Sequence, residues 1–141
     1  MPAIHFFEED ITYKPKNKTS LRQWLKDTIT TEGYRLKELN YIFCSDAYLL
    51  QVNQQYLDHD TYTDIITFDN SEQEKVIVGD IFISAERVKE NAAKFNVTEA
   101  AELRRVMVHG ALHLLGYPDK TPASKKIMTG KENEYLAKIT F

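Results

Sequence analysis

The sequence predicts an α+β protein with a small mixed sheet of about four strands and helices packed on that sheet. Short β-prone apolar runs alternate along the chain with longer segments in which apolar residues recur at helical spacing. The length of 141 residues lies within the usual size of one domain, so we expect residues 1–141 to form a single domain. Hydrophobic residues make up 43% of the chain, a share typical of a protein with a packed core.

Two strands and one helix are expected in the N-terminal part. The β-prone stretch at residues 4–7 predicts a first strand. Thr19 or Ser20 is a suitable N-cap for the helix that follows, and Gly33 stands just past its end. The apolar run at residues 39–44 predicts a second strand.

A helix and a hairpin are expected in the middle of the chain. Ser45 or Asp46 can cap the helix, and the polar residues 57–62 predict a loop after it. Two apolar runs follow, at residues 65–68 and 76–84, joined by a polar segment. A hairpin is the simplest way to pair them.

The C-terminal part is expected to be helical. Ser84 opens one helix, Thr98 caps a longer core helix that ends at Gly116, and residues 117–122 form a loop before a last helix. The inward positions in the first of these helices are predicted to be Ala85, Val88, Ala92 and Phe95. The last helix carries the apolar residues Ile127, Met128, Tyr135 and Leu136.

Charge is distributed unevenly along the chain. The net charge of −3 argues against a protein that binds nucleic acid by bulk electrostatics. Residues 1–83 hold 8 basic and 14 acidic residues, a charge of −6, whereas residues 84–141 hold 10 and 7, a charge of +3. A polyanion is therefore expected to dock on the C-terminal part. A basic run lies there, formed by Lys120, Lys125, Lys126 and Lys131. Because Glu132 and Glu134 follow it, the run can also be interpreted as a solvated helix face.

The expected location is the cytoplasm, without membrane contact. No apolar run approaches the roughly 20 residues that a bilayer span requires, and the first residues lack the basic and apolar regions of a signal peptide. Cys44 is the sole cysteine, so it has no partner for an intramolecular disulfide and is compatible with a reducing compartment.

Two histidines and an aspartate form the pattern that indicates chemistry. His109 and His113 are four residues apart near the end of the core helix, so both imidazoles lie on one face and can bind one ion. Gly116 lets the chain turn back, and Asp119 can add a carboxylate. Three protein ligands with an open position are typical of catalytic zinc, whose bound water is the only catalytic group that the pattern indicates. A structural role for the histidine pair stays open.

A zincin-like metallopeptidase is an alternative with the same ligand spacing. Metzincin proteases carry a glutamate directly after the first histidine as general base, and this chain has Gly110 there. The absence of that carboxylate disfavours a peptidase. A position without a side chain would also leave space beside the metal for a bulky substrate.

Three ordered segments resemble the YbeY family of metal-dependent endoribonucleases. HGALHLLGY at residues 109–117 is similar to the histidine motif of that family. TDIITF at residues 63–68 looks like its Thr-Asp-apolar strand, and GDIFIS at residues 79–84 looks like its Gly-Asp-Ile strand. With Asn53 and Tyr56 ahead of them, the resemblance extends over most of the chain.

The resemblance implies a cytoplasmic bacterial enzyme that cleaves single-stranded RNA in ribosomal RNA maturation and in quality control of the small ribosomal subunit. It implies one Zn²⁺ per chain, a ribosomal RNA precursor as substrate, small-subunit proteins as further partners, and no DNA. Family members carry a third histidine, preceded by aspartate, where this chain has Pro118 and Asp119, so another divalent metal is also compatible. Leu57 stands where the family has an arginine, and Lys120 is the nearest cation by sequence to replace it.

Other residues have both a functional and a structural interpretation. Thr63 and Asp64 could contact substrate or act as turn and cap residues. Asp80 could accept a hydrogen bond from a ligand histidine, and His59 could be a fourth ligand or an ordinary loop residue. Because the family arginine is missing, a ribosome-associated assembly factor with a structural metal and no cleavage activity stays an alternative to the nuclease.

Overall fold

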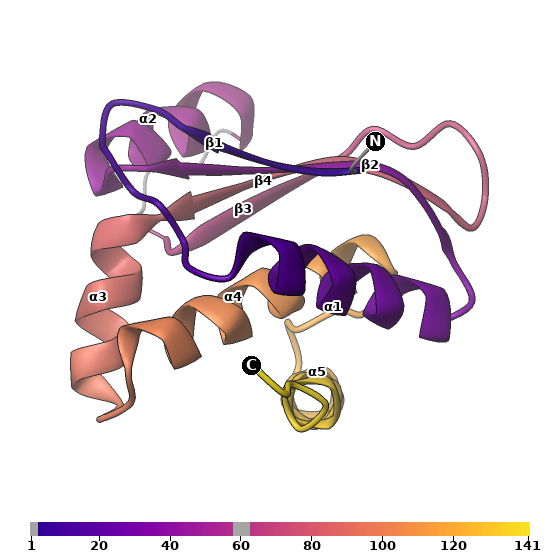
Figure 1. Ribbon diagram of the computed structural model, residues 1–141. Helices are drawn as coiled ribbons and strands as arrows, with labels where there is room; N and C mark the ends of the chain where they lie inside the picture. Colours follow the sequence, from indigo (N-terminus) through magenta and orange to yellow (C-terminus); the bar gives the residue numbers. More distant parts are fainter. Residues whose placement is uncertain (1–2, 58–62) are drawn as a thin grey trace.

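The computed structural model describes residues 3–57 and 63–141, which form a four-stranded sheet and five helices (Figure 1). In chain order the elements are β1 (Ile4–Glu8), α1 (Lys18–Thr31), β2 (Arg35–Cys44), α2 (Asp46–Leu57), β3 (Ile65–Asp69), β4 (Val76–Ser84), α3 (Ala85–Lys94), α4 (Glu99–Leu114) and α5 (Pro122–Leu136). The α+β class and the mixed sheet predicted from the sequence are confirmed.

The strands lie in the order β1-β2-β4-β3. β1 pairs with β2 and β2 with β4 in parallel, whereas β3 pairs with β4 in antiparallel orientation. The expected hairpin is therefore present, with Ile65 opposite Ile83 and Asp69 opposite Gly79. β3 is consequently an edge strand, and it packs against α4.

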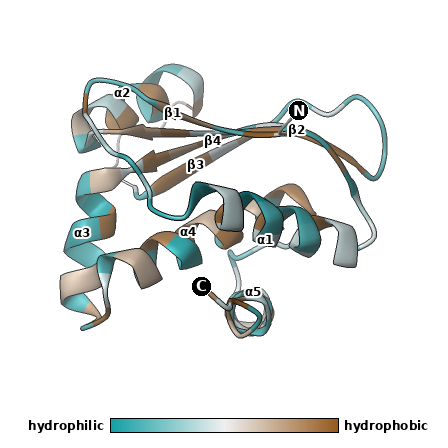
Figure 2. Cartoon of the chain, viewed as in Figure 1, coloured by the Kyte–Doolittle hydropathy of each residue, from teal (hydrophilic) through white to brown (hydrophobic). Residues whose placement is uncertain are grey.

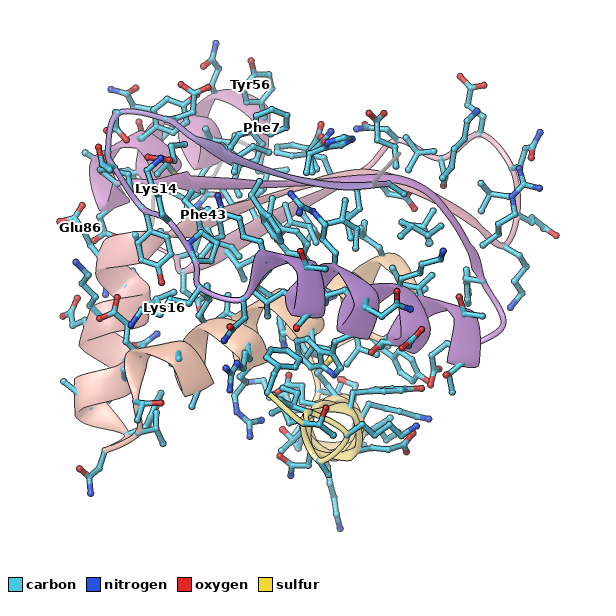
Figure 3. All side chains as sticks on the ribbon, in the orientation of Figure 1. Phe7, Lys14, Lys16, Phe43, Tyr56 and Glu86 are labelled. Atoms are coloured by element: carbon cyan, nitrogen blue, oxygen red, sulfur yellow. The ribbon has the colours of Figure 1, made fainter. Side chains whose placement is uncertain are left out.

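One face of the sheet is covered by α1 and α4, and α5 packs on the far side of α4 (Figure 1). Side chains of a strand alternate between the two faces, and in β2 the residues Leu39, Tyr41 and Phe43 are fully buried against these helices. Figure 3 shows Phe43 on this inner side. Figure 2 shows mostly hydrophobic strands above helices in which hydrophilic and hydrophobic residues alternate.

The opposite face of the sheet is covered in part by α2. A second, smaller cluster of buried side chains lies there, formed by Cys44, Leu49, Val52 and Ile66. Phe7 and Tyr56 lie on this side with 50% and 65% of their surface exposed (Figure 3).

Two hydrogen bonds tie the buried aromatic side chains to the helices. The Trp24 Nε1–H of α1 donates to the Tyr135 carbonyl of α5 at 2.8 Å. The Tyr41 hydroxyl of β2 donates to the Met107 carbonyl of α4 at 2.9 Å. A buried indole or phenol would be destabilising without such a partner, so these bonds fix where α4 and α5 sit.

Helix α1 begins earlier than predicted. Asn17, not Thr19 or Ser20, is the N-cap, in the left-handed region at φ 59°. The Asn17 carbonyl accepts the Leu21 N–H at 2.8 Å, so Thr19 and Ser20 lie within the first helical turn. The signal was misplaced because Asn17 caps with its backbone and makes no side-chain cap bond.

Strand β2 is longer than the predicted run at residues 39–44. Its first half, Arg35 to Glu38, is mostly exposed but pairs with β4 through backbone hydrogen bonds. An apolar run marks only the buried half of a strand, because backbone pairing does not require apolar side chains. Of the predicted loop at residues 57–62, Leu57 belongs to α2, and the other five residues, including His59, lie outside the described part of the chain.

Phe95, which the sequence predicts to point inward, is exposed, and so is the apolar Ile127 of the last helix. Phe95 is 58% exposed because α3 ends at Lys94 and Phe95 is its C-cap, beyond the helical face. Ile127 is 57% exposed because its neighbour Met128 occupies the buried position on α5. Within the described ranges, no helix has the length and apolar character to cross a membrane.

Candidate metal centre

Helix α4 carries both histidines. The Thr98 hydroxyl accepts the Ala101 N–H at 3.1 Å, which confirms Thr98 as the N-cap. Glu99 and Glu102 stand in the first turn, where negative charge is favourable to a helix. The side chains of His109 and His113 project from one face near the C-terminal end, with 22% and 28% of their surface exposed.

The turn after α4 reverses the chain. Gly116 has φ 99°, which is unfavourable for residues with a Cβ. The Gly116 N–H donates to the His113 carbonyl at 3.0 Å, and the Tyr117 N–H donates to the Leu112 carbonyl at 3.1 Å. These two bonds form a Schellman motif, as the glycine position predicted. The chain therefore returns toward the histidines within three residues.

Asp119 lies beside both histidines after this turn. Its Oδ2 atom is 3.3 Å from His109 Nε2 and 3.2 Å from His113 Nε2. The two imidazole rings have their centroids 4.8 Å apart and are nearly perpendicular, at 85°. The sequence brings these three residues together as the spacing predicted, and one ligand atom from each lies within 4.8 Å of the others.

The three donors fit a divalent metal ion. Two ligand atoms about 2.1 Å from a tetrahedral ion are themselves about 3.4 Å apart, close to the separations between Asp119 and each imidazole. Two imidazole nitrogens and one carboxylate oxygen suit zinc, and the carboxylate also suits harder ions. Among the described residues, this is the one group of three or more histidine, cysteine or acidic side chains that could hold a metal.

A buried carboxylate orients His109. Glu132 of α5, with 7% of its side chain exposed, has Oε2 2.6 Å from His109 Nδ1. Its other oxygen, Oε1, accepts a hydrogen bond from Arg105 at 2.7 Å. With its Nδ1–H donating to this carboxylate, a neutral His109 ring has its lone pair on Nε2, which faces Asp119.

The pKa of His109 reflects this surrounding. Burial alone would lower it, but the hydrogen bond and charge of Glu132, together with the charges of Asp119 and Asp64, raise it above the ordinary value of 6.5. Without a bound cation, the site therefore attracts positive charge. That is the electrostatic property expected of a group of metal ligands.

Glu132 was missed in the sequence, where the acidic residues after the basic run suggested a solvated helix face. The structure shows Glu132 on the buried stripe of α5, between Met128 and Tyr135. Those three residues are spaced by four and three, the pattern of a buried helical face. The signal that could have revealed Glu132 is its place on this face, because a carboxylate among buried positions needs a hydrogen-bond donor or a cation beside it.

An open cleft of about 430 Å³ surrounds the three donors. The three sequence-predicted substrate residues, Thr63, Asp64 and Lys120, line this cleft, and so does Leu57. Lys120 is the one cation among the described residues that line it. The remaining wall is formed by Ile65, Ile66 and Thr67 of β3, with Asn53 of α2.

The space expected at Gly110 does not exist. Gly110 faces the sheet, not the cleft, and a Cβ added there would lie 2.8 Å from Ile65 Cδ1 and 3.1 Å from two atoms of Ile81. The missing side chain lets α4 approach β3 and β4 closely, so Gly110 adds no space to the cleft beside the three donors. The same contacts exclude a zincin-type glutamate at this position.

The role suggested for Asp80 is also wrong. Its carboxylate accepts hydrogen bonds from Asn40 at 2.9 Å and from Asn70 at 3.1 Å, which joins β2, β4 and the end of β3. Glu132 holds the acceptor position beside His109 instead. Sequence order alone could not distinguish the two carboxylates, because the sheet topology decides which one reaches the histidine.

Comparison with known proteins gives one consistent family. A family model described as endoribonuclease YbeY matches residues 3–140. A Cytophaga hutchinsonii protein named endoribonuclease YbeY is 54% identical over 96% of this chain and 94% of its own length. One of the same name from Flavobacterium psychrophilum is 49% identical over 92% of each chain. The solution structure of TM1509 from Thermotoga maritima superposes with a TM-score of 0.64 at 30% identity, covering 94% of this chain and 86% of that one.

Proposed function

The chain belongs to the endoribonuclease YbeY family, and from that membership we propose that it is a metal-dependent endoribonuclease of ribosomal RNA maturation. The proposed substrate is a single-stranded segment of a ribosomal RNA precursor, and the proposed cofactor is one Zn²⁺ per chain. We further propose a role in quality control of the small ribosomal subunit, with contacts to its proteins, in the cytoplasm.

The observation that supports metal dependence is the convergence of three donors at an open cleft. His109, His113 and Asp119 are each half-buried, so a ligand can reach them from solvent. A structural zinc site is usually closed by a fourth protein ligand, often cysteine, and the sole cysteine, Cys44, is buried in the cluster beneath α2. The open donor set therefore favours a catalytic over a structural site.

Each residue of the cleft has a distinct proposed role. A divalent ion held by His109, His113 and Asp119 would supply Lewis acidity beside a phosphodiester. Lys120 offers its ammonium group to a phosphate oxygen, and the Thr63 hydroxyl offers a hydrogen bond. Asp64 lines the same cleft and is the carboxylate outside the donor set that can accept a proton from an attacking hydroxyl.

The experiment that tests the proposal is RNA cleavage by the purified protein with and without a chelator, combined with elemental analysis. We expect the chelator to abolish cleavage of an unstructured RNA and added Zn²⁺ to restore it. His113→Ala should be inactive, whereas His5→Ala, on β1, is the matched control and should cleave normally. Cleavage by His113→Ala that resists the chelator would contradict metal dependence.

The chemical nature of the product ends identifies the nucleophile. A 2′,3′-cyclic phosphate with a 5′-hydroxyl requires attack by the 2′-hydroxyl of the substrate, whereas a 5′-phosphate that carries solvent oxygen, with a 3′-hydroxyl on the other product, requires attack by water. An RNA with a 2′-deoxy substitution at the cleavage site separates the two, because it can react only by the second route.

An assembly factor without cleavage activity is the second candidate, and Leu57 favours it. The residue is 40% exposed and lines the cleft where the family has an arginine, so the cleft has less positive charge to hold a phosphate. Purified protein that binds ribosomal RNA fragments with Zn²⁺ present but never cleaves them would support this candidate. Cleavage of peptides in place of RNA would revive the metallopeptidase.

The basic run after the cleft is the proposed entry side for RNA. Lys120, Lys125 and Lys126 are exposed. Each lysine that neutralises a phosphate contributes roughly 0.7 to the slope of log K against log salt for a single strand, so the triple alanine variant should flatten that slope by about 2 units. A matched control removes three exposed lysines of the acidic N-terminal part: Lys16, Lys26 and Lys37. An equal effect of both triple variants would contradict a defined entry side.

A further inference from the structure

Glu32, at the end of α1, receives three hydrogen bonds from the segment after α4. The Tyr117 hydroxyl donates to its Oε1 at 2.5 Å. The Tyr135 hydroxyl donates to Oε2, and the Lys131 ammonium donates to the same oxygen at 3.2 Å. The Glu32 side chain is only 11% exposed, so both carboxylate oxygens are satisfied by protein groups. None of these four residues lines the cleft of the metal centre.

A fixed turn places Glu32 at this point. Glu32 is the C-cap of α1, and Gly33 follows with φ 87°. The Gly33 N–H donates to the Thr30 carbonyl at 3.0 Å and the Tyr34 N–H donates to the Ile29 carbonyl at 3.1 Å, which is again a Schellman motif. The carboxylate is therefore presented by a rigid backbone.

The same turn is connected to the metal-site loop at two points, Leu115 and Tyr117. The Tyr34 hydroxyl donates to the Leu115 carbonyl at 2.9 Å, and Tyr117 is held by Glu32. Asp119 is only two residues beyond Tyr117. Pro118 stands between them, and a proline fixes its own φ and restricts the residue before it. Few backbone rotations are thus left free between the held Tyr117 and the carboxylate of Asp119.

We propose that Glu32 is a positioning residue, which holds Asp119 beside His109 and His113 through its hydrogen bond with Tyr117. The inference rests on the proposed metal-dependent function, and it assigns to the end of α1 a part in metal binding. Glu32 lies at the end of α1 and Asp119 follows α4, so the two residues are far apart in the sequence. The position of Asp119 would therefore depend on how α1 packs.

The charge of Glu32 is suited to this role. Burial alone would raise its pKa, but the hydrogen bonds from Tyr117, Tyr135 and Lys131 lower it below the usual 4.5. Glu32 is therefore ionised at neutral pH and a strong acceptor for both tyrosines. Lys131, whose Nζ also lies 5.8 Å from the centroid of the Tyr117 ring, balances the charge.

The two tyrosines allow a matched test. Tyr117→Phe and Tyr135→Phe each remove one hydroxyl from the same carboxylate, but only Tyr117 belongs to the loop that carries Asp119. Zinc affinity is measured by competition with a chromophoric chelator, and the stability of each metal-free variant by urea unfolding. We expect Tyr117→Phe to weaken zinc binding about tenfold, whereas Tyr135→Phe should lower stability and leave zinc affinity within about twofold of wild type.

A second measurement does not involve metal. Backbone ¹⁵N order parameters of the metal-free protein should fall at residues 119 and 120 in Tyr117→Phe but not in Tyr135→Phe. Unchanged zinc affinity and unchanged order in Tyr117→Phe would overturn the role of Glu32, and so would equal losses of affinity in both variants. Wild-type protein that binds no zinc would contradict the proposed function instead, and the order parameters would still decide whether Glu32 holds the loop.

Discussion

Replacing Glu132 by glutamine should weaken metal binding although the two side chains have nearly the same shape. The carboxylate satisfies two donors at once, Arg105 at 2.7 Å and the Nδ1 of His109 at 2.6 Å. A glutamine has one acceptor oxygen and one donor group, so it can satisfy only one of the two. If its oxygen faces Arg105, its NH₂ faces Nδ1 and favours the tautomer with the proton on Nε2, the atom proposed to bind metal.

The expected loss is set by the surroundings of Glu132. Its side chain is 7% exposed, so water cannot easily replace the lost acceptor. Removing a carboxylate that orients a ligand histidine typically weakens metal binding tenfold to a hundredfold. At 1.36 kcal/mol for each factor of ten, that is about 1.4 to 2.7 kcal/mol, in line with the roughly 1 to 3 kcal/mol for leaving a buried polar group unpaired.

A double variant separates this mechanism from general damage. In Glu132→Gln with Arg105→Met, no guanidinium competes for the amide oxygen, so the oxygen can face His109 and zinc affinity should recover in part. Glu134→Gln is the matched control, because Glu134 is 47% exposed and pairs with Lys131 at 3.7 Å. Zinc competition and the ¹⁵N shifts of the imidazole give the readouts. Wild-type affinity in Glu132→Gln, or no recovery in the double variant, would refute the reasoning.

Three further changes have defined outcomes. Asp119→His should keep or raise zinc affinity, since imidazole is the softer ligand, and Asp119→Ala should lower it; equal affinity in all three proteins would show that Asp119 is not a ligand. Gly110→Ala should destabilise the fold by about 0.5 to 2 kcal/mol in urea unfolding, because overpacking against Ile65 outweighs the gain in helix propensity; an unchanged midpoint would contradict the close packing. The lowered pKa of Glu32 means that its ionised form stabilises the fold at pH values above 4.5 and that this contribution is lost as pH falls through the lowered pKa. Glu32→Gln should therefore make the stability of the metal-free protein less dependent on pH below 4.5, and an unchanged slope would count against the hydrogen bonds described.

Features encoded by local signals could be predicted from the sequence. Thr98 caps α4 with its own hydroxyl, and Gly116 provides the backbone conformation that ends the reversal. The convergence of the His109, His113 and Asp119 side chains then follows from the geometry of one helix and one turn. These signals lie within about twenty consecutive residues, so no knowledge of the tertiary fold was needed.

Features that depend on contacts distant in sequence could not be predicted. The pairing of β2 with β4 places Asp80 among asparagines and leaves the position beside His109 to Glu132. Gly110 was interpreted as open space because the sequence does not reveal that Ile65 fills it. For Asp80 and Gly110 the sequence indicates an unusual residue, but only the tertiary packing decides what each of them contacts.

The hydrogen bond between Trp24 and the Tyr135 carbonyl provides a built-in optical probe. The chain has one tryptophan, so its intrinsic indole emission comes from a single site between α1 and α5. Trp24 is 6% exposed, and undocking of α5 would admit water and shift the emission to longer wavelength. Because α5 also carries Glu132, fluorescence can show, without any label, whether a variant has lost that helix or only one of the proposed metal ligands.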